Sequence, residues 1–116
     1  MKLLHVTIQT DKFEQELGFY QTIIGLRMIR DMRSLGRNLV FLADGEGDTE
    51  IEIIENADAK NAGNENLSIG FKTQDVDEMR AQLTAEGFEA TPMISPAPQV
   101  KFFFVKDPAG VSVQFM

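Results

Sequence analysis

One pattern of strands and a helix occurs twice in this chain, and this internal repeat limits the fold more than any single segment does. Gly25 and Gly87, which each follow an apolar helical stretch, lie 62 residues apart. Asp11 and Asp75, which each precede such a stretch, lie 64 residues apart. A nearly constant offset over a half-chain indicates that one supersecondary unit is used twice.

The first unit has the pattern of one strand, one helix and three further strands. Residues 2–9 alternate apolar and polar side chains, which is the period of a strand. Asp11 stands three residues before Glu14, which is typical of a capped helix start, and Gly25 supplies the stop. Apolar runs between turn residues predict the other strands over residues 27–32, 38–42 and 49–55.

The second unit follows a polar linker over residues 56–66 and repeats this order. Its helix is expected between Asp75 and Gly87, and the Ser-Pro-Ala-Pro segment at 95–98 is expected to be a loop. Strands are expected over residues 67–72, 89–93, 100–106 and 111–115. We therefore predict one α+β domain over residues 1–116, with two βαβββ modules in tandem (1–56 and 66–116) forming a cup-shaped mixed sheet whose helices lie on the outer face.

Alternation along each strand predicts which side chains face the cup. On the first strand, Leu4, Val6 and Ile8 face the helix, so His5 and Thr7 face the cup. The same argument applied to the fourth, fifth and eighth strands adds six polar side chains: Glu50, Glu52, Ser68, Lys72, Ser112 and Gln114.

An aromatic wall is expected from the run Phe102-Phe103-Phe104. Alternation places either the outer two rings or the middle ring in the cup and leaves that choice open; Phe103 is taken as the candidate ligand contact. A polar floor inside an apolar wall is typical of a small-molecule site. Burying His5 and Glu52 is costly unless they pair with each other or bind an ion, so a structural pair and a metal site are both open.

Composition excludes several other function classes. The chain has no cysteine, which removes disulfides, thiol nucleophiles and zinc-finger sites. Its formal net charge of -7 argues against nucleic-acid binding, and no apolar run is long enough to cross a membrane. A cytoplasmic protein is the expectation. The basic residues Arg27, Arg30, Arg33 and Arg37 are interpreted mainly as a solvated strand and turn, with an anion-binding role as the less favoured alternative.

Two short motifs resemble a known family. Phe19-Tyr20 followed by Ile24-Gly25-Leu26 is similar to a "FYxxxLG" segment, and Asp107-Pro108-Ala109-Gly110 is similar to a "DPxG" turn. In this order, together with the repeat, they resemble the glyoxalase/bleomycin-resistance (vicinal oxygen chelate) superfamily over essentially the whole chain. The resemblance implies a small-molecule ligand and a homodimer.

The resemblance also implies a metal site with one ligand from the first, fourth, fifth and eighth strands. These positions carry His5, Glu52, Ser68 and Gln114. His5 and Glu52 match the family pattern, whereas Ser68 and Gln114 depart from it. The implied ligands of a divalent ion (nickel, cobalt, manganese, iron or zinc) are therefore His5, Glu52 and Gln114.

The activity implied is that of a lyase or isomerase similar to lactoylglutathione lyase, which removes a proton next to a carbonyl. Glu52 or Glu50 would be the base. The substrate contacts expected are Thr7, Ser68, Lys72, Phe103 and Ser112. The alternative is a metal-free binding protein that sequesters a bulky molecule without catalysis. A third hypothesis is a vestigial cup in a domain whose role is dimerisation.

Overall fold

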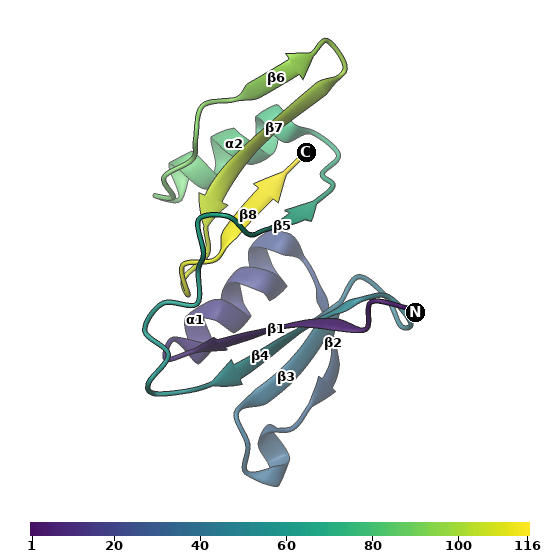
Figure 1. The fold of residues 1–116 in the computed structure, drawn as a ribbon, viewed down its shortest axis with the longest axis vertical. Coiled ribbons are helices and arrows are strands. Elements are labelled where there is room, and N and C mark those ends of the chain that lie inside the picture. Colours follow the sequence, from purple (N-terminus) through teal and green to yellow (C-terminus); the bar gives the residue numbers. More distant parts are fainter. The chain divides into compact units, whose positions relative to one another are not determined.

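Two four-stranded mixed sheets, each with a helix against one face, make up the fold of residues 1–116 (Figure 1). The computed structural model describes all 116 residues. It divides them into unit 1, residues 1–62, and unit 2, residues 63–116. The division lies inside the predicted linker 56–66. The predicted α+β class and the two tandem βαβββ modules are confirmed.

Unit 1 contains one sheet with the strand order β1-β4-β3-β2. β1 pairs with β4 in parallel, whereas β3 pairs with its two neighbours antiparallel. The elements are β1 (His5–Thr10), α1 (Phe13–Gly18), the π-helical segment η1 (Phe19–Ile24), β2 (Arg27–Asp31), the 3₁₀ turn η2 (Arg33–Leu35), β3 (Leu39–Ala43) and β4 (Glu50–Glu55).

Unit 2 has the equivalent strand order β5-β8-β7-β6. β5 and β8 are parallel, and β7 pairs with β6 and β8 antiparallel. The elements are β5 (Ser68–Phe71), α2 (Val76–Ala85), β6 (Ile94–Ala97), β7 (Val100–Lys106) and β8 (Ser112–Phe115). No helix in either unit is long and apolar enough to span a bilayer.

The strand register shows that the sequence repeat is a structural repeat. The parallel pair β1–β4 places His5 opposite Glu50 and Thr7 opposite Glu52. The parallel pair β5–β8 places Ser68 opposite Ser112 and Gly70 opposite Gln114. Each residue of the second set lies 62 or 63 positions after its counterpart in the first, so the two modules present equivalent positions on equivalent faces.

Strand alternation predicts the core correctly inside the strands and incorrectly at their ends. Ile53 and Val113 are buried against the helices as expected. Leu4 and Leu67, which alternation assigns to the helix-facing side, are 61% and 66% exposed. Each lies one residue before its strand begins, at His5 and at Ser68, so the pleat does not direct its side chain.

The two helix starts differ, although both have an acidic residue in the predicted capping position. Asp75 caps α2, because its carboxylate accepts a hydrogen bond from Glu78 N at 3.0 Å. The prediction for Asp11 is wrong. The N-cap of α1 is Lys12, whose N–H donates to Thr10 Oγ1, and Asp11 pairs with Lys60 at 3.1 Å.

The edge strand of unit 2 lies in a segment predicted to be a loop. β6 spans Ile94–Ala97 and contains Pro96, which an edge strand tolerates because one side of its backbone makes no ladder hydrogen bonds. The strand predicted over residues 89–93 does not form. There, Thr91 takes the place of a regular ladder: its Oγ1 accepts from Phe104 N, and its own N–H donates to Phe104 O.

The helix of unit 1 widens after Gly18 into the π-helical segment η1, which helical periodicity did not predict. The wider turn brings both Phe19 and Tyr20 into the core, with their rings edge to face at 5.1 Å. Gly25 ends the segment with a φ of 85°, as predicted, and Leu26 N then donates to Tyr20 O.

A matched pair of glycines tests this helix end. Gly25→Ala should destabilise the protein by about 1–2 kcal/mol, because an alanine there must adopt a left-handed conformation although no atom lies within 4 Å of the added methyl group. Gly18→Ala, with helical φ and equally open space, should stabilise it by up to about 1 kcal/mol. Urea unfolding measures both. Equal effects would contradict the conformational explanation.

Candidate functional site

Four side chains from four strands form a row on the face of unit 1 opposite α1. Cross-strand register places Arg30 beside Phe41, Phe41 beside Glu52, and Glu52 beside Thr7. His5 lies two residues before Thr7 on β1 and therefore shares its face. The structure thus brings together the predicted residues His5, Thr7 and Glu52.

Glu52 is the centre of this group. Its Oε1 accepts a hydrogen bond from the Thr7 hydroxyl at 2.5 Å and lies 3.7 Å from His5 Nε2. The edge of the His5 ring packs against Phe41, with 6.0 Å between ring centroids. His5 Nδ1 is buried and makes no hydrogen bond, so ring packing orients this histidine.

Glu50, the second candidate base, is engaged by Arg30. The two side chains form an ion pair of 2.8 Å between Arg30 Nη2 and Glu50 Oε1, and Glu50 is only 8% exposed. The Arg30 guanidinium also lies 4.1 Å above the centre of the Phe41 ring. This double engagement leaves Glu52 as the stronger candidate base.

The His5–Glu52 pair fits two positions of a divalent-ion site. Two donors about 2.1 Å from one ion lie roughly 3 Å apart when adjacent and roughly 4 Å apart when opposite. The observed 3.7 Å between His5 Nε2 and Glu52 Oε1 lies between these two values, so the two donors would shift by roughly half an ångström to hold one ion. A neutral imidazole and a carboxylate also suit the borderline divalent metals. Within unit 1, no third His, Asp or Glu side chain joins them.

The equivalent face of unit 2 has neutral groups at these positions. Ser68 stands where unit 1 has His5, and Gln114 where it has Glu52. Gly70 replaces Thr7, and a methyl group added at Gly70 would lie 3.3 Å from Gln114 Oε1. Gly70 therefore leaves open, beside Gln114, the room that the threonine side chain occupies beside Glu52 in unit 1.

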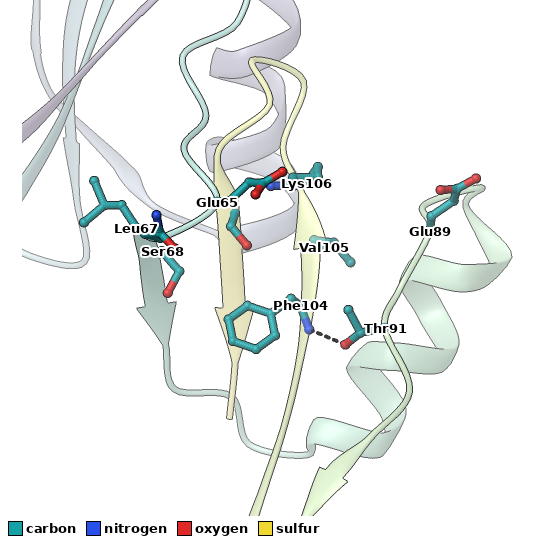
Figure 2. Close-up of a pocket in the computed structure, with 10 residues that line it drawn as sticks. Glu65, Leu67, Ser68, Glu89, Thr91, Phe104, Val105 and Lys106 are labelled. Carbon is teal, nitrogen blue, oxygen red and sulfur yellow. Dashed lines mark hydrogen bonds between the residues drawn. The ribbon is translucent and has the colours of Figure 1, made fainter.

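Unit 2 also contains a pocket of about 370 Å³ on this face (Figure 2). This volume lies in the range of small-molecule sites. Two predicted ligand contacts, Ser68 and Ser112, line it. The complete lining is Glu65, Asn66, Leu67, Ser68, Glu89, Thr91, Phe104, Val105, Lys106 and Ser112.

The candidate contacts Phe103 and Lys72 do not line this pocket. Phe103 has no exposed surface and stacks on Phe115 at 5.2 Å, in the core beneath α2. Phe104 provides the aromatic wall instead. Lys72 follows the last residue of β5 and lies outside the pocket. Thr91 and Lys106 were not predicted from the sequence. Once Phe103 is known to be buried, alternation along β7 places Lys106 on the pocket face.

Three of the four arginines of the predicted basic group have separate local partners. Arg33 forms side-chain hydrogen bonds with Asp31, which together with a backbone hydrogen bond lower the pKa of that carboxyl from 3.8 to about 2. Arg27 Nε donates to the backbone oxygen of Asp44 at 2.9 Å. With Arg30 held by Glu50, these side chains support the interpretation of a strand and turn stabilised by local pairs.

Comparison with known proteins finds relatives over the full length of the chain. The profile of the Glyoxalase/Bleomycin resistance protein/Dioxygenase superfamily matches residues 2–115. A lactoylglutathione lyase of Haemophilus influenzae is 27% identical over 124 residues, which cover 100% of this chain and 92% of that protein. A lactoylglutathione lyase of Neisseria meningitidis serogroup A is 28% identical over 126 residues, with coverage of 100% and 90%.

Solved structures share the fold at lower identity. The trypanothione-dependent glyoxalase I of Leishmania major superposes with a TM-score of 0.77 at 23% identity, covering 100% of this chain and 86% of that one. TnmS3, an antibiotic-binding protein from Streptomyces sp. CB03234, superposes with a TM-score of 0.75 at 17% identity, covering 99% and 93%. One fold thus includes a glyoxalase and an antibiotic-binding protein.

The Arg30–Glu50 pair can be tested by a double-mutant cycle. Arg30→Met should destabilise the protein by about 1–2 kcal/mol, because it leaves a nearly buried carboxylate without its partner. Glu50→Gln in the Arg30→Met background should recover part of that loss, with a coupling energy of at least about 0.5 kcal/mol. Urea unfolding measures the free energy of unfolding of Arg30→Met, of Glu50→Gln and of the double variant. Additive effects of the two substitutions would show that the pair contributes nothing to stability.

Proposed function

The chain belongs to the glyoxalase/bleomycin resistance protein/dioxygenase superfamily, and we propose that it binds a small molecule and acts on it as a metal-dependent lyase or isomerase. His5 and Glu52 would hold the divalent ion. Glu52 is the proposed base. The lactoylglutathione lyases among its relatives support an assay with the hemithioacetal of glutathione and methylglyoxal.

The observation that carries this proposal is the arrangement of His5, Glu52 and Thr7. The imidazole and the carboxylate face each other at 3.7 Å on neighbouring strands, and the Thr7 hydroxyl holds one carboxylate oxygen at 2.5 Å. That hydrogen bond helps to orient the Glu52 carboxylate. Oε1, which lies 3.7 Å from His5 Nε2, would contact the ion, and Oε2 would accept the proton. A purely structural pair would favour a direct hydrogen bond between His5 and Glu52, which a separation of 3.7 Å does not allow.

The chain's own groups divide the work in this proposal. A divalent ion bound at the site would polarise a substrate carbonyl. Glu52 would accept the proton from the carbon beside that carbonyl, because Arg30 already neutralises the neighbouring Glu50. Thr7 would act as a positioning residue through its bond to Glu52. Pairing into a homodimer, which the family resemblance implies, stays a prediction.

A metal-free binding protein is the second candidate function. The neutral Ser68 and Gln114 and the pocket beside Phe104 favour it, since none of them needs an ion to form a binding surface. The similarity in fold to an antibiotic-binding protein is consistent with this alternative. In it, His5 and Glu52 are part of a polar floor without a catalytic role.

Metal titration separates the two candidates. Calorimetric titration of chelator-stripped protein with nickel, cobalt, manganese and zinc should show one ion bound per chain at near stoichiometric ratio. His5→Ala should abolish this binding, because it removes the one imidazole of the chain. Glu52→Gln should weaken it strongly, whereas Glu55→Gln, an exposed carboxylate on the same strand, should leave it unchanged.

The outcome determines which assay follows. If the ion binds through His5 and Glu52, turnover of the hemithioacetal should depend on the same two residues and on the ion. If no ion binds, or if Glu55→Gln weakens binding as much as Glu52→Gln, the metal-dependent activity is excluded and the sequestration hypothesis replaces it.

A further inference from the structure

Three polar side chains form a second row, across three adjacent strands of unit 2. Register pairs Lys106 on β7 with Ser112 on β8, and Ser112 with Ser68 on β5. All three line the pocket of about 370 Å³. Neighbouring strands lie about 4.8 Å apart, so one ammonium and two hydroxyl groups follow each other across the sheet at close range.

The donors of this row are not used inside the protein. Lys106 Nζ, Ser112 Oγ and Ser68 Oγ take part in no ion pair or side-chain hydrogen bond, whereas the other lysine of β7, Lys101, is paired with Asp77 at 2.6 Å. Hydroxyl and ammonium groups are strong donors, and three of them directed at one pocket are complementary to an oxyanion.

The internal repeat shows that this chemistry is particular to unit 2. The positions equivalent to Lys106, Ser112 and Ser68 in unit 1 are occupied by Ala43, Glu50 and His5. The same backbone positions thus carry a methyl group, a carboxylate and an imidazole in one module, and an ammonium and two hydroxyl groups in the other. The two modules therefore present surfaces of different charge on equivalent faces.

An aromatic ring completes the pocket. Phe104 lies two positions before Lys106 on β7 and therefore shares its face. Its ring packs edge to face with Phe102, with 5.8 Å between the ring centroids. Figure 2 shows the Phe104 ring between Ser68 on β5 and Thr91, with Lys106 further along β7, the strand of Phe104. A planar apolar group could stack on this ring while its charged end reached the row.

We propose that the pocket of unit 2 binds an aryl carboxylic acid, with the carboxylate on Lys106, Ser112 and Ser68 and the ring against Phe104. This inference deepens the small-molecule binding proposed above, and it does not depend on a metal at His5 and Glu52. The hydroxyl of Thr91, which accepts from Phe104 N, still has its own hydrogen to donate to the ligand.

Two acidic side chains, Glu65 and Glu89, also line the pocket and oppose an anion. Both are exposed, and neither forms an ion pair with Lys106. Lys106 is exposed as well, so solvent and salt weaken the repulsion and the attraction alike, and no ion pair within the protein neutralises Lys106. Removing one of these negative charges should strengthen the binding of a carboxylate, whereas removing the positive charge of Lys106 should weaken it.

The experiment compares phenylacetate with its uncharged amide, phenylacetamide, by NMR titration of the metal-free full-length protein. We expect phenylacetate to shift the amides of residues 68, 106 and 112 and to bind about three- to tenfold more tightly than the amide. Lys106→Met should weaken phenylacetate binding by a similar factor. Lys101→Met, the other lysine on β7, should leave it unchanged, and Glu65→Gln should tighten it.

Four results would overturn the inference: equal affinity for acid and amide, equal losses in Lys106→Met and Lys101→Met, shifts confined to residues outside the pocket, or no binding of either probe. Equal affinity for phenylacetate and phenylacetamide would still show that the pocket binds a small molecule, but it would contradict the proposed recognition of the carboxylate. None of these results bears on the proposed metal site at His5 and Glu52, because the metal titration that tests it uses no organic ligand.

Discussion

The parallel register between the first and fourth strands of each module is the constraint on which the rest of the structure depends. It places His5 beside Glu50 and Thr7 beside Glu52, and in unit 2 Ser68 beside Ser112. Because side chains alternate across a strand, this register decides which of them share a face with the partner strand. A shift of one residue would direct the polar set into the core against the helices and expose Ile51 and Ile53.

On this common backbone the two modules have acquired different surfaces. Unit 1 concentrates charge: Glu52 is held by Thr7, and Glu50 by Arg30, which also covers the ring of Phe41. Unit 2 has a serine and a glutamine at the equivalent positions of β8, and hydroxyl groups line its pocket together with the charged side chains Lys106, Glu65 and Glu89. The two modules thus share one backbone frame, and the residues at a few register positions give their equivalent faces different charge.

The ion pair between Glu50 and Arg30 shows why residue types alone do not identify a candidate base. Two glutamates on the same face of β4 are indistinguishable in the sequence. In the folded protein one is paired with an arginine from β2, across the intervening strand β3, and the other is held by a hydroxyl from β1. Their chemistry differs because their neighbours come from different strands, and those neighbours are set by the order β1-β4-β3-β2.

The sequence by itself determined the repeat, the α+β class, the left-handed stop at Gly25 and the faces of β4 and β8, because local periodicity and turn chemistry carry this information. It also selected His5, Thr7 and Glu52 as neighbours. It could not decide between Phe103 and Phe104, since a run of three aromatic residues has no alternation, and only the stacking of Phe103 on Phe115 beneath α2 resolves it. The strand at Ile94–Ala97, the Arg30–Glu50 pair and the position of Lys106 beside Ser112 likewise required the tertiary structure, because each depends on cross-strand register between segments that the sequence keeps apart.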